Sequence, residues 1–217
     1  MVTESIAAKR ARAHTVYKDQ DGRRLPGVTT VLGVLNKPAL VPWANGLGLA
    51  GINVREYVDV LARIGTMGHD MIMHHHKGEE AVFPDDAPDL VSKAENCLLS
   101  YLAWAKGKSI EPILYEVPLV SEQYSYGGTV DFYGMVDGVP TIVDYKTGKA
   151  IYAEHVYQVS AYRQLLEEHG YRVDEVRILQ IGRSEDEGFS EKVVTDTSRE
   201  WRIFELCLEL RSLAVGK

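Results

Sequence analysis

Residues 127–162 constrain the fold more than any other part of the chain. They predict a strand that contains Asp131, a turn at residues 137–138, a second strand that ends at Lys146, and then a helix. Side chains on a strand alternate between its two faces, so Asp144 and Lys146 point the same way. The turn brings the two strands together, so Asp131 is expected alongside Asp144. Two unpaired carboxylates repel each other, and a divalent cation between them relieves that repulsion.

The remaining hydrophobic periodicity predicts an α/β fold with a mixed sheet flanked by helices. Strands are predicted near 112–120, 126–136, 139–146 and 174–182, and amphipathic helices over 52–77, about 89–106 and about 197–214. Residues 188–196 are expected to form an antiparallel neighbour of the last strand or an edge. We expect one domain over 1–217, with an N-terminal extension over 1–50, a core over 52–182, and a C-terminal strand and helix over 183–217.

The first fifty residues predict a hairpin followed by short helices. The hairpin spans residues 14–24 and belongs to a region with six cations, Lys9, Arg10, Arg12, Lys18, Arg23 and Arg24. These cations form either a solvated tail or an arm that contacts phosphates. Thr29 and Thr30 are expected to cap a short helix, and a second helical segment is expected to start at Trp43. On the residues alone, these threonines, Lys37 and Trp43 have ordinary roles in capping, solvation and packing.

The helix predicted over 52–77 carries four of the seven histidines. His69 follows Gly65 and Gly68, and glycine permits close approach of another backbone, so this histidine can reach a metal. A lone helical histidine is nevertheless more often a surface or core residue. The run at 74–76 fans around the helix axis and cannot converge on one ion, which indicates a solvated helix end. The apolar face of the helix is expected at Val54, Val58, Leu61 and either Ile64 or Gly65.

Glu116 interrupts an otherwise apolar strand, where an unpaired carboxylate is costly and needs a metal or a lysine as its partner. Together, Glu116, Asp131 and Asp144 offer the oxygen ligands that Mg²⁺ or Mn²⁺ prefers. Lys146 adds a point charge that can orient or deprotonate a water molecule and contact a phosphate. This combination suits metal-dependent hydrolysis of a phosphodiester.

Composition sets further limits. The formal net charge of −7 argues against a simple basic nucleic-acid surface, although bound cations and a local basic groove can offset it. Cys97 and Cys207 lie in amphipathic patterns and are expected to be buried apolar residues. We find no long apolar run and no signal-peptide pattern, and therefore expect a cytoplasmic protein without membrane contact.

Four short motifs resemble the PD-(D/E)XK nuclease superfamily in its RecB-like branch. GGTVD looks like its G-x-x-D, VDYKTGK like its D-x-K-T-G, QVSAY like its Q-x-x-x-Y, and GTMGH like its G-x-x-x-H. The resemblance covers about residues 65–182 and implies a restriction-endonuclease-like core. It gives Asp131, Asp144, Glu116 and His69 metal-binding roles and Lys146 the activation of water. Gln158, Tyr162 and Thr147 would orient the site or the DNA.

The segment PGVTTVL, with Lys37 and Trp43, looks like the opening of the mitochondrial genome maintenance exonuclease group and its phage relatives, which resect single-stranded DNA ends. The resemblance makes Thr29, Thr30 and Lys37 candidate contacts to the DNA backbone. Members of the superfamily that hold an iron–sulfur cluster carry four cysteines. This chain has two, so no iron–sulfur cluster is expected in it. No Walker A motif is present, and any helicase would be a partner, as would a recombinase or single-strand-binding protein.

The resulting hypothesis is an exonuclease that uses Mg²⁺ or Mn²⁺ and acts on single-stranded DNA ends in replication, recombination or repair, with phage origin suggested by analogy. Three alternatives stay open. A structure-specific endonuclease would use the same chemistry. A non-catalytic DNA-binding relative would not bind metal. A sugar or nucleotide hydrolase would use the carboxylates as acid and base but gives Lys146 no role.

Overall fold

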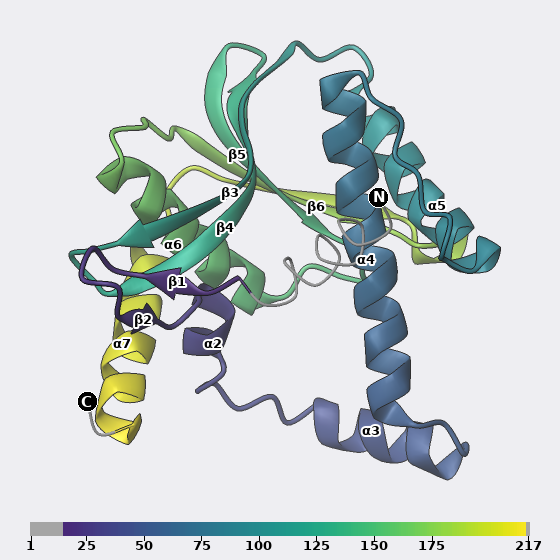
Figure 1. Cartoon of the computed structure of the whole chain (residues 1–217), viewed down its shortest axis with the longest axis horizontal. Coiled ribbons are helices and arrows are strands. Elements are labelled where there is room, and N and C mark those ends of the chain that lie inside the picture. Colours follow the sequence, from purple (N-terminus) through teal and green to yellow (C-terminus); the bar gives the residue numbers. More distant parts are fainter. Residues whose placement is uncertain (1–14, 216–217) are drawn as a thin grey trace.

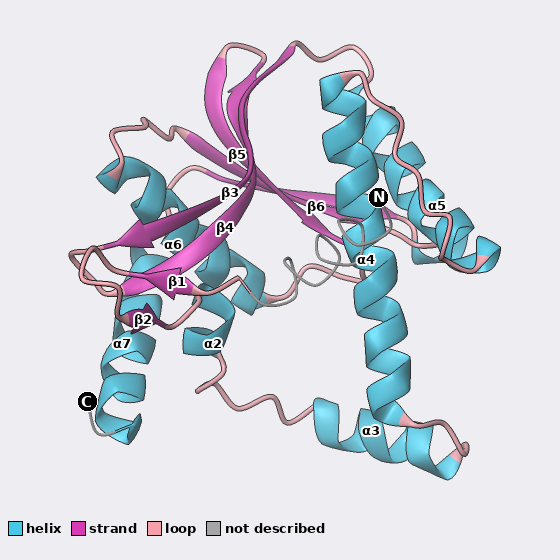
Figure 2. Ribbon diagram, viewed as in Figure 1, coloured by secondary structure: helices cyan, strands magenta, loops and turns pink. Residues whose placement is uncertain are grey.

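The computed structural model describes residues 15–215, so the expected N-terminal cations Lys9, Arg10 and Arg12 lie outside the described residues. A five-stranded sheet with the order β3-β4-β5-β6-β7 forms its centre (Figures 1 and 2). The strands are β3 (Ile110–Ser121), β4 (Tyr126–Val136), β5 (Val139–Lys146), β6 (Glu175–Ile181) and β7 (Phe189–Val194). The predicted mixed α/β fold is confirmed.

Strands β3, β4 and β5 form an antiparallel meander, whereas β5 and β6 are parallel. A parallel pair needs a crossover, and α6 (Ala153–Glu168) provides it. Strand β7 pairs antiparallel with β6 and ends the sheet, so both predictions for residues 188–196 are confirmed. The crossover leaves the end of β5 free to enter a loop directly after Lys146.

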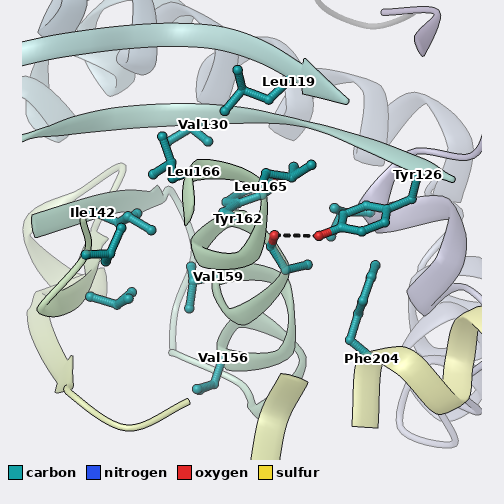
Figure 3. Close-up of a cluster of buried hydrophobic side chains, with 14 of the residues drawn as sticks. Leu119, Tyr126, Val130, Ile142, Val156, Val159, Tyr162, Leu165, Leu166 and Phe204 are labelled. Atoms are coloured by element: carbon teal, nitrogen blue, oxygen red, sulfur yellow. Dashed lines mark hydrogen bonds between the residues drawn. The ribbon is translucent and has the colours of Figure 1, made fainter. Parts of the chain in front are cut away.

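Helices cover both faces of the sheet (Figure 1). On one face, α6 packs with α2 (Val28–Leu32) and α7 (Ser198–Val215) around the largest apolar cluster. Figure 3 shows this cluster, in which the Tyr126 hydroxyl donates a 2.8 Å hydrogen bond to the Ala161 carbonyl. On the other face, α5 (Pro88–Ala105) and the C-terminal half of α4 (Val54–Lys77) bury the second cluster. Both cysteines are buried and free, as expected.

The N-terminal segment has the predicted hairpin, with β1 (Tyr17–Lys18) antiparallel to β2 (Arg24–Leu25). The predicted caps are wrong, because α2 already begins at Val28, ahead of both threonines, and its N-cap is Gly27. The extended backbone of Gly27 forms a bridge with Gly127 of β4, and this contact fixes where the helix begins. Thr29 and Thr30 therefore lie exposed within the helix. Helix α3 (Leu40–Leu49) also begins before Trp43.

The predicted apolar face of α4 is wrong at Val58, whereas Val54 and Leu61 are half-buried. Val58 is 43% exposed, and burial begins only at Ile64 and continues through Met67, Met71 and Ile72. The reason is that α4 extends past the sheet, and α3 packs beside its N-terminal turns (Figure 1). Leu213, near the end of α7, is likewise 74% exposed. No helix within residues 15–215 has the length and apolar character needed to cross a membrane.

The histidine run at the end of α4 is not wholly solvated, contrary to the prediction. His75 is exposed, but His76 packs against Tyr101, Tyr115 and Phe132. The Tyr101 hydroxyl lies 2.7 Å from His76 Nε2. Burial, and then the neighbouring His75, lower the pKa of His76 to about 4. Because the last turn of α4 lies over the sheet, one of three consecutive side chains must face it.

Candidate active site

Glu116 and Asp131 lie opposite each other on β3 and β4. The pairs Tyr115–Phe132 and Val117–Val130 flank this position. Glu116 has a φ of 45°, in the left-handed region that non-glycine residues rarely adopt. Such backbone conformations are uncommon and persist where the surrounding structure holds them. The strand thus departs from regular geometry at the residue whose carboxylate enters the site.

The strands β4 and β5 separate at Asp131. Their backbone pairing ends at Phe132 and Val143, and beyond it the Tyr145 backbone N–H donates a 3.0 Å hydrogen bond to Asp131 Oδ2. The carboxylate therefore occupies the place that a strand carbonyl would take. This arrangement fixes one oxygen of Asp131 and leaves Oδ1 to face His69, which lies 3.5 Å away.

His69 on α4 completes a cluster with these two acids. Its Nδ1 lies 3.4 Å from Glu116 Oε1, and its Nε2 lies 3.1 Å from the Tyr145 carbonyl oxygen. A carbonyl only accepts, so Nε2 carries the proton and donates, which directs Nδ1 toward the carboxylates. One ligand atom from each of His69, Glu116 and Asp131 lies within 4.8 Å of the others. The cluster thus has the donor atoms and the spacing of a metal site.

The same contacts shift the pKa values of the cluster. Burial lowers the pKa of His69, but the Asp131 and Glu116 carboxylates outweigh it and raise this pKa to about 10. For Asp131, burial raises the pKa, and the charges of His69 and Lys146 outweigh burial and lower it. The acids therefore stabilise positive charge at His69. A proton on Nδ1 and a metal ion would be held by the same pair of carboxylates.

Asp144 and Lys146 form an ion pair at the end of β5, with Lys146 Nζ 2.7 Å from Asp144 Oδ2. Asp144 is 1% exposed, and its Oδ1 has no hydrogen-bond partner. Burial raises the pKa of Asp144 to about 6, opposed by Lys146 and reinforced by Asp131. A buried carboxylate oxygen without a donor is well suited to a cation, so the site fits a hard divalent ion. Asp144 nevertheless lies outside the 4.8 Å cluster that contains Asp131.

Two glycines of α4 allow this helix to approach the end of β5. A Cβ at Gly65 would lie 2.7 Å from Thr147 Oγ1, and one at Gly68 would lie 3.2 Å from Cys97 Cβ and 3.6 Å from Thr147 Cγ2. Larger side chains would push α4 away from the sheet. The spacing of glycine and histidine in GTMGH thus brings His69 to the two acids.

Gln158 and Tyr162 lie on α6, one turn apart, and Gln158 Nε2 donates a 2.6 Å hydrogen bond to the Tyr162 hydroxyl. Tyr162 is buried, and its ring lies over Gly128, where a Cβ would be 2.7 Å from Tyr162 Cε1. Burial, and then the charges of Asp144 and Asp131, raise the pKa of Tyr162. The glycine pair of GGTVD is therefore required for packing, because Gly127 likewise faces the ring of Tyr17.

A cleft of about 1250 Å³ opens beside the cluster. Its lining includes the following residues that the sequence singled out: His69, Glu116, Asp131, Thr147, Tyr162, Thr29 and Thr30. Asp144, Lys146, Gln158 and Lys37 are not part of the lining. Lys37 Nζ instead lies 3.1 Å from Glu154 Oε1 at the start of α6.

Sequence reasoning missed one wall of this cleft. Leu208, Arg211, Ser212 and Val215 line it from α7. Their spacing of three and four residues places them on one helix face. That spacing is visible in the sequence, but it does not reveal that this face of α7 borders the site.

Comparisons with known proteins give no family assignment. No family model matches the chain, and no curated protein matches it. Among solved structures, an alkaline exonuclease, LHK-Exo, from Laribacter hongkongensis is similar at 12% identity, with a TM-score of 0.38 over 88% of this chain and 90% of that one. LHK-Exo in complex with dAMP is similar at 12% identity, with a TM-score of 0.32 over 70% and 84% of the two chains.

Proposed function

We propose that this chain is a deoxyribonuclease that uses Mg²⁺ or Mn²⁺ and removes nucleotides from single-stranded DNA ends. The observation that carries the proposal is the convergence of His69, Glu116 and Asp131 in one cleft. The ion pair of Asp144 and Lys146 at the end of the next strand supports it. The hydrolase alternative based on paired carboxylates alone explains neither the histidine nor the lysine.

In this proposal, Glu116, Asp131 and His69 hold the metal ion, with Asp144 beside them. When bound, such an ion lowers the pKa of water and neutralises charge on the phosphate. The Asp131 carboxylate is already oriented for binding an ion, because the Tyr145 N–H holds one of its oxygens by a hydrogen bond. The Tyr145 carbonyl orients His69 through Nε2, so that Nδ1 faces the acids.

Lys146 has the role of orienting the attacking water and contacting the scissile phosphate. Its Nζ is held by Asp144 at 2.7 Å, and an ammonium has two further protons to donate. Because Asp144 is buried, the ion pair restrains the lysine side chain at the strand end. The ammonium is therefore placed before the substrate arrives.

The first experiment measures degradation of end-labelled single-stranded DNA with and without Mg²⁺ or Mn²⁺. Replacing Lys146 by Met is expected to slow degradation by about 10³-fold. The matched control is Lys149→Met, which removes an exposed lysine three residues along the same loop. Equal activity of the two variants would refute the role of Lys146.

Two further measurements separate this proposal from its rivals. Covalently closed circular single strands stay intact with an enzyme that requires ends, whereas an endonuclease cuts them. Calorimetric titration with Mn²⁺ distinguishes the non-catalytic alternative, because a DNA-binding relative without a metal centre gives no saturable heat.

A further inference from the structure

The cleft contains two arginines that the chemistry above does not use. Arg24 lies on β2 and Arg211 on α7, and both line the cleft that contains the acid cluster. Within residues 15–215, neither guanidinium forms an ion pair. By contrast, Arg23, next to Arg24, lies 3.7 Å from Asp21 Oδ2 and outside the lining. The arginines that face the cleft are thus available to an anion from outside.

These two arginines come from segments that are far apart in the sequence but line the same cleft. Helix α2 packs against α7, and residues 27–30 at the start of α2 also line this cleft, as does the hairpin β1–β2. Helix α4 contributes a second lining set, Leu61, Ala62, Gly65, Thr66 and His69, at helical spacing. The cleft therefore has α4 with His69 as one wall and the hairpin with α7 as another.

We propose that Arg24 and Arg211 bind backbone phosphates of the DNA strand, next to the phosphate that is cleaved. A guanidinium offers several fixed donors that match phosphate oxygens, and its charge does not titrate near neutral pH. The net charge of −7 makes such local cations necessary, because an acidic protein otherwise repels a nucleic acid. The inference rests on the proposed function and extends it by assigning the path of the strand between α7 and the hairpin.

The test is binding of a fluorescent single-stranded oligonucleotide to the full chain in EDTA, measured by anisotropy across a salt series. The double variant Arg24→Gln/Arg211→Gln is expected to lose about tenfold in affinity. The slope of log affinity against log salt should decrease by about 1.4, since each single-strand phosphate contact contributes about 0.7. The lysine pair Arg24→Lys/Arg211→Lys keeps the charge and should keep the slope.

The matched control is Arg23→Gln/Arg199→Gln, which removes the same charge outside the cleft, from the residue directly before β2 and from α7. Thermal melting confirms that all variants fold. If the test variant binds DNA as the control does while wild type degrades DNA, the phosphate assignment is wrong and the nuclease proposal stands. If wild type neither binds nor degrades DNA, the proposed function fails and the assignment fails with it.

Discussion

Gly65 on α4 and Thr147 after β5 are in contact so close that a Cβ at position 65 would lie 2.7 Å from Thr147 Oγ1. One turn further along α4, His69 lies within 3.5 Å of Asp131 Oδ1. The separation of α4 from the sheet at Gly65 therefore sets the distance between the histidine and the acids.

This relationship predicts that Gly65→Ala weakens metal binding. Alanine favours a helix, but its methyl group must displace Thr147 or α4, and overpacking of this kind costs about 1–3 kcal/mol. We expect at least about tenfold lower Mn²⁺ affinity by calorimetry. Thr147→Ala removes the clashing oxygen, so the double variant should regain the affinity of Thr147→Ala alone. Additive losses in the double variant would contradict the contact.

His69→Ala is expected to lower Mn²⁺ affinity by about tenfold or more and Mg²⁺ affinity by less, because imidazole is a better ligand for transition metals than for Mg²⁺. Titration of each ion into the purified chain measures both effects. His75→Ala is the control, because His75 lies exposed on the same helix. Unchanged Mn²⁺ affinity in His69→Ala would remove the histidine from the metal site.

Gly128→Ala is expected to destabilise the fold by about 1–3 kcal/mol. The new methyl group would lie 2.7 Å from Tyr162 Cε1 and 3.0 Å from Leu165 Cδ1, inside the largest apolar cluster. Urea unfolding measures the change in the free energy of unfolding. Gly46→Ala on α3 has open space around the added Cβ and should be neutral or stabilising. A similar result for both variants would show that the strand moves freely away from α6.

The half-buried His76 predicts a loss of stability in acid. Its pKa is lowered to about 4 from an ordinary 6.5, so folding favours the neutral ring. The stabilisation is complete above pH 6.5 and is lost as the pH falls toward 4, as the ring gains a proton and loses the hydrogen bond from Tyr101. Burial lowers the pKa of His155 similarly, to about 4.

His76→Gln should therefore reduce the loss of unfolding free energy between pH 7 and pH 5 by about 1 kcal/mol relative to wild type, because solvent screens part of the effect at a half-buried ring. Urea unfolding at the two pH values measures this difference. The control is His75→Gln at the exposed neighbour, which should keep the pH dependence of wild type. If His76→Gln also kept it, the His76 ring would have to be solvated in the folded protein.

The sheet was predictable because its signals are local. Strand alternation placed Asp144 and Lys146 on one face, and they form an ion pair. The sequence predicted that Asp131 would lie alongside Asp144, and the structure also places Glu116 opposite Asp131. The prediction that Val58 of α4 is buried was wrong. Its burial depends on which turns of the helix lie over the sheet, and the sequence around Val58 does not specify this.

The candidate site shows the same division. The acids come from three successive strands, but the wall that contains Arg211 belongs to α7, and Arg211 follows Lys146 by 65 residues. Helical spacing identifies the face of α7 without identifying what it borders. The partial burial of His76 was not predicted for the same reason. The aromatic rings that pack against it come from residues distant in the sequence.

The antiparallel meander that holds all three acids has a consequence for how this chain tolerates change. Deleting a single residue between Asp131 and the turn at Asp137 would rotate every upstream side chain of β4 to the reverse side of the sheet. The carboxylate would then be turned toward the aromatic layer beneath α5, and Phe132 would be turned toward the solvent-filled cleft. Length variation in this hairpin is therefore far more damaging than substitution, and natural insertions should gather in the loops on either side of it.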